Sequence, residues 1–141
     1  ASIYYRQRHS RLSTLEVTML DFTERTFKLS AMDPNEVAAQ VAPLLVEGEQ
    51  LFLAFKGARD YVAFTSKRII AVDVQGMSGK KKDFSSLPYA KVQVFSVESS
   101  GAFDRDAELE LWFSGVGRVK FEFKGGTDVA YLSRLVATYV L

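Results

Sequence analysis

The sequence predicts a mainly β fold, in which seven antiparallel strands form a sandwich or barrel with one helix before them and one after. Three observations carry this prediction. Apolar and polar residues alternate with period two through most of residues 49–124, turns rich in glycine and proline divide this stretch, and both flanks change to helical periodicity. The turns are short, which favours antiparallel neighbours, because parallel pairs need crossovers of a dozen or more residues.

A helix is expected over residues 34–46. Asp33 can accept hydrogen bonds from the free N–H groups of the first turn, Pro34 suits the first helical position, and Glu36 would complete a capping box. Pro43 should end this helix after about three turns, because proline interrupts the hydrogen-bond pattern.

Seven strands should follow this helix. The alternating stretches are 51–56, 61–65, 69–74, 80–87, 92–97, 107–113 and 118–123. Within Val92–Val97 the apolar positions change parity between Val94 and Phe95, so we expect a β-bulge or a strong bend there.

The chain should end in an amphipathic helix. Thr127 is the expected N-cap, and Asp128 suits the positive end of the helix. The apolar stripe consists of Val129, Leu132, Val136, Tyr139 and Val140. This stripe should cap the open end of the sandwich, because a solvated helix would leave it exposed.

Residues 1–30 are set apart from the domain 31–141 as an N-terminal extension of uncertain structure. Leu12, Leu15 and Met19 have helical spacing, whereas the alternation of Leu15, Val17 and Met19 with polar residues is typical of a strand. The threonines favour the strand, and the sequence leaves both alternatives open.

The composition excludes several classes of function. Among 141 residues there is no cysteine, which removes disulfides, thiolate nucleophiles and the common structural zinc sites, and fits a reducing, cytoplasmic location. The formal net charge of +1 gives no general attraction to nucleic acid. We therefore expect no catalytic residue, no metal, no cofactor and no nucleic-acid partner.

Two features that could suggest a catalytic or metal site have a structural explanation. His9 is the sole histidine and lies in an arginine-rich start, where we read it as a solvated side chain. Acidic residues recur at every second position of 104–110, which places them on one strand face; we interpret this row as a solvated face rather than as a cation site, because it lacks a ligand-wrapping loop.

Residues 30–141 resemble a known family. The runs that carry the resemblance are Leu-Val-Glu-Gly-Glu-Gln (45–50), Arg-Asp-Tyr-Val-Ala-Phe-Thr-Ser-Lys-Arg-Ile-Ile (59–70), Gly-Lys-Lys (79–81), Leu-Pro-Tyr (87–89), Phe-Ser-Val-Glu (95–98), Phe-Asp-Arg-Asp-Ala-Glu-Leu (103–109) and Ala-Thr-Tyr-Val-Leu (137–141). They resemble the bacterial pleckstrin-homology-like (PH-like) domain family, a family of unknown function. The resemblance implies a PH-like barrel or sandwich, no established enzymatic chemistry and a ring-like homo-oligomer.

The function favoured by the sequence is a non-catalytic interaction module that self-assembles, with an unidentified protein as a further candidate partner. Trp112 is the sole tryptophan and lies at outward parity on its strand, where it would be an association anchor. Phe52 and Ile69 are assigned to outer strand faces that need cover, and Tyr4 and Tyr5 suggest an N-terminal arm that adds a strand to an exposed edge.

The alternative function is binding of an anionic ligand or a membrane lipid headgroup at a basic loop. Lys80, Lys81 and Lys82 follow one turn, while Lys56 and Arg59 flank another. Successive lysines on a strand point to alternate faces, and lysines on an edge strand also protect it from aggregation. The lysine run therefore has a structural explanation beside the functional one.

Overall fold

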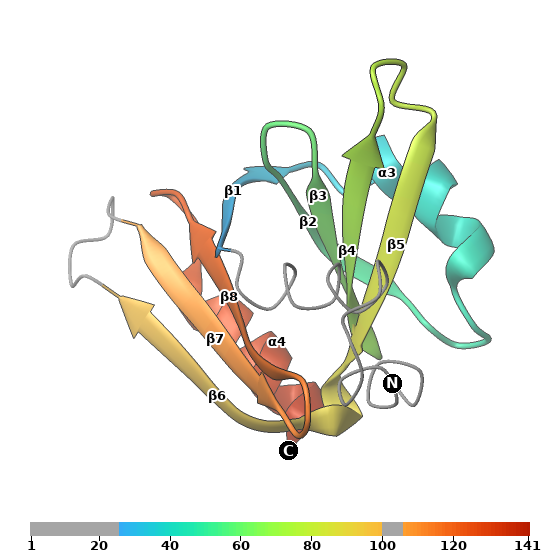
Figure 1. The fold of residues 1–141 in the computed structure, drawn as a ribbon. Helices are drawn as coiled ribbons and strands as arrows, with labels where there is room; N and C mark the ends of the chain where they lie inside the picture. The colour runs from blue at the N-terminus through green and yellow to red at the C-terminus, as the bar shows by residue number, and fades with distance from the viewer. Residues whose placement is uncertain (1–25, 100–105) are drawn as a thin grey trace, which may run out of the picture.

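The computed structural model describes residues 26–99 and 106–141 of the chain (Figure 1). Its strands are β1 (Thr26–Met32), β2 (Leu51–Lys56), β3 (Tyr61–Thr65), β4 (Arg68–Gln75), β5 (Lys81–Pro88), β6 (Val92–Ser99), β7 (Ala107–Phe113) and β8 (Gly117–Phe123). Its helices are α3 (Asn35–Val41), α4 (Val129–Val140) and the one-turn 3-10 helices η1 (Ala42–Leu44) and η2 (Tyr89–Lys91). The predicted mainly β fold with a helix on each flank is confirmed.

The strands form one strongly curved sheet of eight strands in the order β5-β4-β3-β2-β1-β8-β7-β6. Figure 1 shows the sheet bending round so that β5 and β6 stand on opposite sides of its opening, joined at one end through η2. Within the described residues the barrel is therefore open. All seven predicted strands are present, but the prediction of seven was one short.

The additional strand is β1, which joins the two halves of the sheet. Residues 30–32 pair antiparallel with β2, and residues 26–29 pair parallel with β8. Phe27 and Leu29 are buried in the core, whereas Lys28 is exposed. The division that the sequence suggests between residues 30 and 31 falls inside this strand, so residues 26–30 belong to the sheet. The parallel pair also departs from the expected all-antiparallel arrangement.

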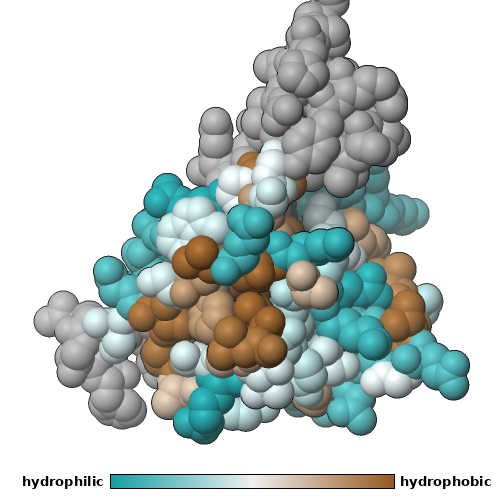
Figure 2. All heavy atoms as spheres, turned by 90° about the horizontal axis from the view of Figure 1, so that it is seen from below, coloured by the Kyte–Doolittle hydropathy of each residue, from teal (hydrophilic) through white to brown (hydrophobic). Residues whose placement is uncertain are grey.

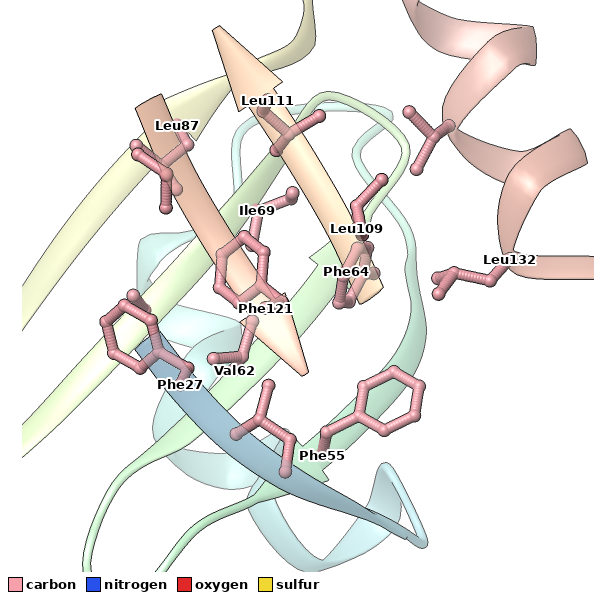
Figure 3. Packing of buried hydrophobic residues seen from close by; sticks show 14 of the residues in the cluster. Phe27, Phe55, Val62, Phe64, Ile69, Leu87, Leu109, Leu111, Phe121 and Leu132 are labelled. Atoms are coloured by element: carbon pink, nitrogen blue, oxygen red, sulfur yellow. The ribbon is translucent and has the colours of Figure 1, made fainter. Parts of the chain in front are cut away.

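The main core fills the inside of the curved sheet. Figure 3 shows side chains of β3 and β4, such as Phe64 and Ile69, pointing toward Leu109 and Phe121 of the opposite half and toward Leu132 of α4. Phe64 lies edge-on to Phe55, with ring centroids 5.6 Å apart, and 6.3 Å from Phe121. Because these residues come from both halves of the sheet and from α4, the core ties together elements that are distant in sequence.

A second, smaller core lies on the opposite face of β2, β3 and β4, beneath α3. It contains Val37 and Val41 of the helix together with Ala63, Ile70 and Val72 of the strands. Strand β3 is consequently buried at every position. The alternation in these strands thus separates two apolar faces rather than an inside from a solvated outside.

This double burial corrects the assignment of Ile69. The sequence placed Ile69 on an outer face, but the side chain is 0% exposed and lies in the main core. The face read as the inside, with Ile70 and Val72, is instead the one that α3 covers. The parity of the residues was right and the assignment of the two faces was inverted, because alternation cannot rank two apolar faces.

The ends of the helices match the predictions in part. Asp33 accepts a hydrogen bond from the Asn35 N–H at 2.9 Å, as expected, but the N-cap of α3 is Pro34, which the sequence placed at the first helical position. The α-helix ends at Val41, where the 3-10 turn that contains Pro43 begins. At the C-terminal helix, however, the N-cap is Asp128, which accepts from the Tyr131 N–H at 3.0 Å. Thr127, the predicted N-cap, donates its hydroxyl to the Lys124 carbonyl instead.

Helix α4 packs against the inside of the sheet with Leu132, Leu135 and Val136, which are buried. Its last turn carries Tyr139, which stacks between Phe52 and Tyr89 with ring centroids 5.9 and 5.8 Å away. The predicted capping role of this helix is therefore confirmed, with Leu135 as an additional core residue.

The predicted irregularity in the strand after η2 is present but begins earlier than expected. The pairing register of β6 with β7 shifts between Val92 and Val94, two residues before the parity change at Phe95. A second shift lies between Leu51 and Leu53 in β2, so that Phe52 and Leu53 both pack against the main core.

A buried polar network fastens the segment after η1 to the sheet. The Glu49 carboxylate, with its side chain 1% exposed, forms a two-pronged ion pair with Arg68, with Nε and Nη2 distances of 2.9 and 3.0 Å. It also accepts from the Thr65 hydroxyl at 2.6 Å and from the Val46 N–H at 3.0 Å. The Arg68 guanidinium further donates to the Leu44 carbonyl and the Ser86 hydroxyl. The network links η1 and the loop before β2 to β3, β4 and β5, so it has a structural role.

Two buried tyrosines differ in how their hydroxyls are satisfied. Tyr61 donates to the Gln40 side-chain oxygen at 2.9 Å and so links β3 to α3. The Tyr89 hydroxyl is buried and finds no hydrogen-bond partner within the described part of the chain. Burial, reinforced by nearby Tyr139 and Glu49, raises the pKa of Tyr89, so the hydroxyl stays neutral.

The two tyrosines should respond differently to removal of the hydroxyl. Tyr61→Phe loses the hydrogen bond that links β3 to α3, so it should destabilise the fold by about 1 kcal/mol. Tyr89→Phe removes an unsatisfied buried group and should leave stability unchanged or raise it by up to about 1 kcal/mol. Urea denaturation of both variants measures this difference. Equal destabilisation by both substitutions would contradict it.

Candidate interaction surface

The outer face of β6, β7 and β8 carries the residue that the sequence singled out as an anchor. Along β7 every second residue is buried, and Trp112 stands half-buried on the other face, between the buried Leu111 and Phe113. Its partners directly across the two neighbouring strands are Val94 of β6 and Arg118 of β8. Val94 is 56% exposed. Trp112 and Val94 therefore form an apolar pair near one end of this face.

The rest of the face is charged and largely paired. Lys120 Nζ lies 3.2 Å from Glu108 and 4.0 Å from Glu110, and Arg118 lies 3.7 Å from Glu110. Asp106 accepts from the Gly125 N–H at 3.0 Å. These contacts pair Glu108 and Glu110 with cations of β8 and place Asp106 on a backbone N–H; residue 104 of the predicted row lies outside the described residues. Within residues 26–99 and 106–141 no cluster of three or more acidic, histidine or cysteine side chains could hold a metal ion.

Exposed apolar side chains also gather at the end of the molecule where the chain terminates. Figure 2 looks onto this end and shows an apolar area in its middle, bordered by polar side chains. The C-terminal end of α4 and the start of β6 both lie here in Figure 1, and they bring Leu141, 95% exposed, and Val94 to this end. The apolar pair on the outer face of β6 and β7 thus adjoins an end face that also carries apolar surface.

The other predicted contact residues have different positions. Phe52 is half-buried and packs against the main core and the Tyr139 ring, so only part of it reaches the surface. Ile69 is fully buried and is not available to a partner. Tyr4 and Tyr5, like His9, lie outside the described residues.

The predicted basic residues meet at the opposite end of the sheet. Arg59, in the turn between β2 and β3, donates a hydrogen bond to the Gly76 carbonyl in the turn between β4 and β5. Lys82 Nζ donates to the Gly79 carbonyl at 3.2 Å. Lys56, Lys80 and Lys81 are exposed. The structure therefore brings the two turns together. Two of the five predicted basic residues, Arg59 and Lys82, hydrogen-bond to the backbone of the second turn. Gly76 and Gly79 of that turn have positive φ values of 75° and 69°, which glycine adopts readily.

Two exposed residues on the end strands were not singled out from the sequence. Val94 was read only as part of an irregular strand, and Phe84 only as part of a polar one, yet they are 56% and 37% exposed. The parity change in β6 was the one available signal for Val94. For Phe84 the signal was a single aromatic residue among polar neighbours, and one apolar residue does not make an alternating pattern.

Comparison with known proteins agrees with this architecture. A family model described as "Bacterial PH domain" matches residues 22–140. The chain belongs to the bacterial PH domain family. The match begins before β1, consistent with the place of that strand in the sheet.

Two curated relatives of this bacterial PH domain come from Bacillus subtilis (strain 168), and both are described as uncharacterized. YjqA is 41% identical over 110 residues, which cover 77% of this chain and 88% of YjqA. YozO is 33% identical over 103 residues, which cover 73% of this chain and 89% of YozO. The family is thus shown, while neither relative brings an assigned function.

Solved structures confirm the PH-like fold. A DUF1696 family protein with a pleckstrin-homology domain from Shewanella loihica PV-4 is 40% identical, with a TM-score of 0.69 and coverage of 82% of this chain and 99% of that one. A pleckstrin-homology domain from Shewanella amazonensis SB2B is 41% identical, with a TM-score of 0.59 and coverage of 92% and 99%. No helix among the described residues is long and apolar enough to cross a membrane.

Proposed function

We propose that this bacterial PH domain is a non-catalytic interaction module that associates with further copies of itself. The observation that carries the proposal is the cross-strand pair of the exposed Val94 and the half-buried Trp112, two apolar residues on a sheet face that otherwise carries polar and charged side chains, several of them in ion pairs. Tryptophan is enriched at the energetic centres of interfaces, where a polar rim surrounds an apolar anchor. Arg118 and Glu110 provide such a rim here.

The open sheet supports the same proposal. A sheet that ends in two different strands offers two different edges, and repeating a contact between unlike edges produces a ring when the rotation closes. The family resemblance described from the sequence implies assemblies of this kind. A protein partner other than a second copy would use the same anchor.

The test of this proposal is Trp112→Ala, which should weaken self-association at least tenfold while the fold stays intact. Light scattering over a concentration series measures the mass in solution, and circular dichroism measures the fold. Tyr131→Ala, on a residue of α4 that is 41% exposed and lies on a different element, is the matched control and should leave the mass unchanged. A Trp112→Ala chain that associates like the parent would overturn Trp112 as the anchor, and a parent that stays monomeric would overturn self-association.

The alternative, an anionic ligand or lipid headgroup at the basic turns, has weaker support. Arg59 and Lys82 both donate to backbone carbonyls of the turn between β4 and β5, so these two cations have a structural role. The remaining lysines, Lys56, Lys80 and Lys81, are exposed, and the contacts of the described residues do not bring them together around one point. Self-association is for this reason the function that we favour.

A further inference from the structure

We infer that residues 12–22 of the chain cover Trp112 and Val94 of their own copy and so compete with a second copy for this surface. This inference rests on the proposed self-association through Trp112 and adds a means of regulating it. The occupant is a segment of the same chain that lies outside the described residues. Three features point to it: the place at which β1 begins, the spacing of apolar residues in the segment, and the composition of the surface.

Strand β1 begins close to the end of the sheet on which this surface lies. Thr26, the first residue of β1, pairs with Lys120 of β8. Because β1 and β8 run parallel, the direction backward along the chain from Thr26 is also the direction from Lys120 to Arg118. Arg118 is the residue of β8 that lies directly opposite Trp112 on β7. The chain therefore enters β1 from the end of the sheet that carries Trp112 and Val94.

The distance across the sheet matches the length of the segment. The strands follow one another in the order β1-β8-β7-β6, and at about 4.8 Å between neighbours β7 and β6 lie roughly 10 and 14 Å from β1. A helix over residues 12–22 is about 16 Å long. With residues 23–25 as the connection to β1, such a helix crosses β8 and β7 and reaches β6. Leu15 then lies over β7, at Trp112, and Leu12 lies over β6, at Val94.

The spacing of the apolar residues in the segment fits one face of a helix. Val17 and Leu20 lie outside this stripe, and the remaining positions between 12 and 22 are polar. The residues of the stripe, three and four positions apart, are Leu12, Leu15, Met19 and Phe22. A strand would need an unpaired sheet edge, whereas β1 already has β2 and β8 on its two sides. A helix needs only an apolar surface, so we assign the helical form to the segment.

The surface is apolar where this stripe would lie and charged beside it. Trp112 is half-buried, and Val94, directly opposite, is 56% exposed. Arg118 lies on the other side of Trp112 and has a largely exposed side chain. Glu16 follows Leu15 in the segment and therefore flanks the stripe, where its carboxylate is available to the Arg118 guanidinium. Both the apolar and the charged parts of the surface thus have a complement in the segment.

Attachment to the same chain favours this contact over one between copies. A linked segment meets its surface at an effective concentration in the millimolar range, so a contact that is weak between separate molecules is populated within one copy. A second copy finds the surface free only in the fraction of molecules from which the segment is released. Its apparent dissociation constant rises by the inverse of that fraction. Residues 12–22 therefore act as an internal competitor that sets the concentration at which copies associate.

The fluorescence of Trp112 tests the cover directly, because Trp112 is the sole tryptophan of the chain. The full chain is measured at a concentration at which light scattering gives the mass of one copy. Leu15→Asp puts a charge into the apolar stripe, so it should shift the emission to longer wavelength and raise the acrylamide quenching constant about twofold as the covered population is released. Val17→Asp, on the opposite side of the helix, is the matched control and should change neither.

Cysteine cross-linking provides the second measurement, since the chain has no cysteine of its own. A chain with Leu12→Cys and Val94→Cys should form a disulfide within one copy under mild oxidation, because the two positions lie in contact. Mass spectrometry distinguishes this product from a disulfide between two chains. A chain with Leu12→Cys and Glu36→Cys, the latter exposed on α3, is the control and should remain reduced.

The competition itself is read from the association of copies. Leu15→Asp should strengthen self-association about fivefold in light scattering, as expected when the covered fraction falls from about four fifths to near zero, while Val17→Asp leaves it unchanged. Unaltered Trp112 fluorescence in Leu15→Asp, or a 12–94 disulfide only between chains, overturns the cover and leaves self-association in place. Weaker association of Leu15→Asp overturns the competition. A chain that stays monomeric with and without Leu15→Asp, although Trp112 becomes exposed, overturns the proposed function and supports the cover.

Discussion

Replacing Arg68 by methionine should lower the free energy of unfolding by about 3–5 kcal/mol, among the largest effects of any single substitution in this domain. The guanidinium donates twice to Glu49 and also to the Leu44 carbonyl and the Ser86 hydroxyl. Methionine fills much of the same space but leaves the Glu49 carboxylate, 1% exposed, without its counter-ion. An uncompensated buried charge is strongly destabilising, whereas loss of an exposed ion pair costs little.

The same substitution at Arg118 is the matched control. Its ion pair with Glu110 spans 3.7 Å, and the Arg118 side chain is 56% exposed, so Arg118→Met should cost less than about 1 kcal/mol. Urea denaturation of the parent and the two variants provides the comparison. Equal losses of unfolding free energy in the two variants would show that the buried pair of Arg68 with Glu49 contributes no more to stability than the exposed pair of Arg118 with Glu110.

The pH dependence of stability tests the Glu49 network independently. Burial acts to raise the pKa of Glu49, but hydrogen bonds from Arg68, Thr65 and the Val46 N–H, with the Arg68 charge, outweigh it and hold the pKa below its usual value. The stabilisation should be fully present above the unfolded pKa of about 4.3 and should be lost as pH falls through the lower folded pKa. The difference in free energy of unfolding between the parent and Glu49→Gln should therefore be constant at higher pH and should decrease only below about pH 4.

Phe64→Ala should destabilise the domain by about 3–5 kcal/mol, because it removes a ring from the centre of the main core. Phe64 is 0% exposed and contacts the rings of Phe55, Phe121 and Phe123, with centroid distances of 5.6, 6.3 and 6.3 Å. Those partners come from β2 and β8, in different halves of the sheet, so the cavity would weaken the contact between the halves as well as the local packing.

Phe84→Ala is the matched control for this prediction, since it removes the same side chain from an end strand where the residue is 37% exposed. It should cost less than about 1 kcal/mol when thermal or urea unfolding is measured at a concentration low enough to keep the chain monomeric. A Phe64→Ala chain as stable as the Phe84→Ala chain would contradict the position of the core between the two halves.

The local patterns of the sequence are sufficient for most of the secondary structure. The seven strands between Leu51 and Phe123 and the helix over Val129–Val140 have the predicted order and nearly the predicted bounds. Alternation and turn residues act between near neighbours, so they can be read without knowing the rest of the fold. The position of Trp112 on the outer face followed from the same alternation.

The candidate surface needed the tertiary structure. Trp112 could be assigned an outward parity, but its partner Val94 depends on the register of β6 after an irregularity, which alternation does not determine. Likewise, the contact of Arg59 with the Gly76 carbonyl joins two turns 17 residues apart. The sequence named residues on both surfaces, and only the pairing of the strands showed which of them meet.

Strand β1 and Ile69 mark the boundary between what the sequence and the structure decide. Phe27 and Leu29 alternate with Lys28, as a strand requires, but the place of this strand between β2 and β8 depends on contacts with residues more than 90 positions away in the case of β8. Alternation places Ile69 and Ala71 on one face and Ile70 and Val72 on the other, but it gives no information about what covers each face. Which face encloses the main core and which receives α3 is decided by how the whole sheet curves, because both faces are apolar and only packing between distant segments distinguishes them.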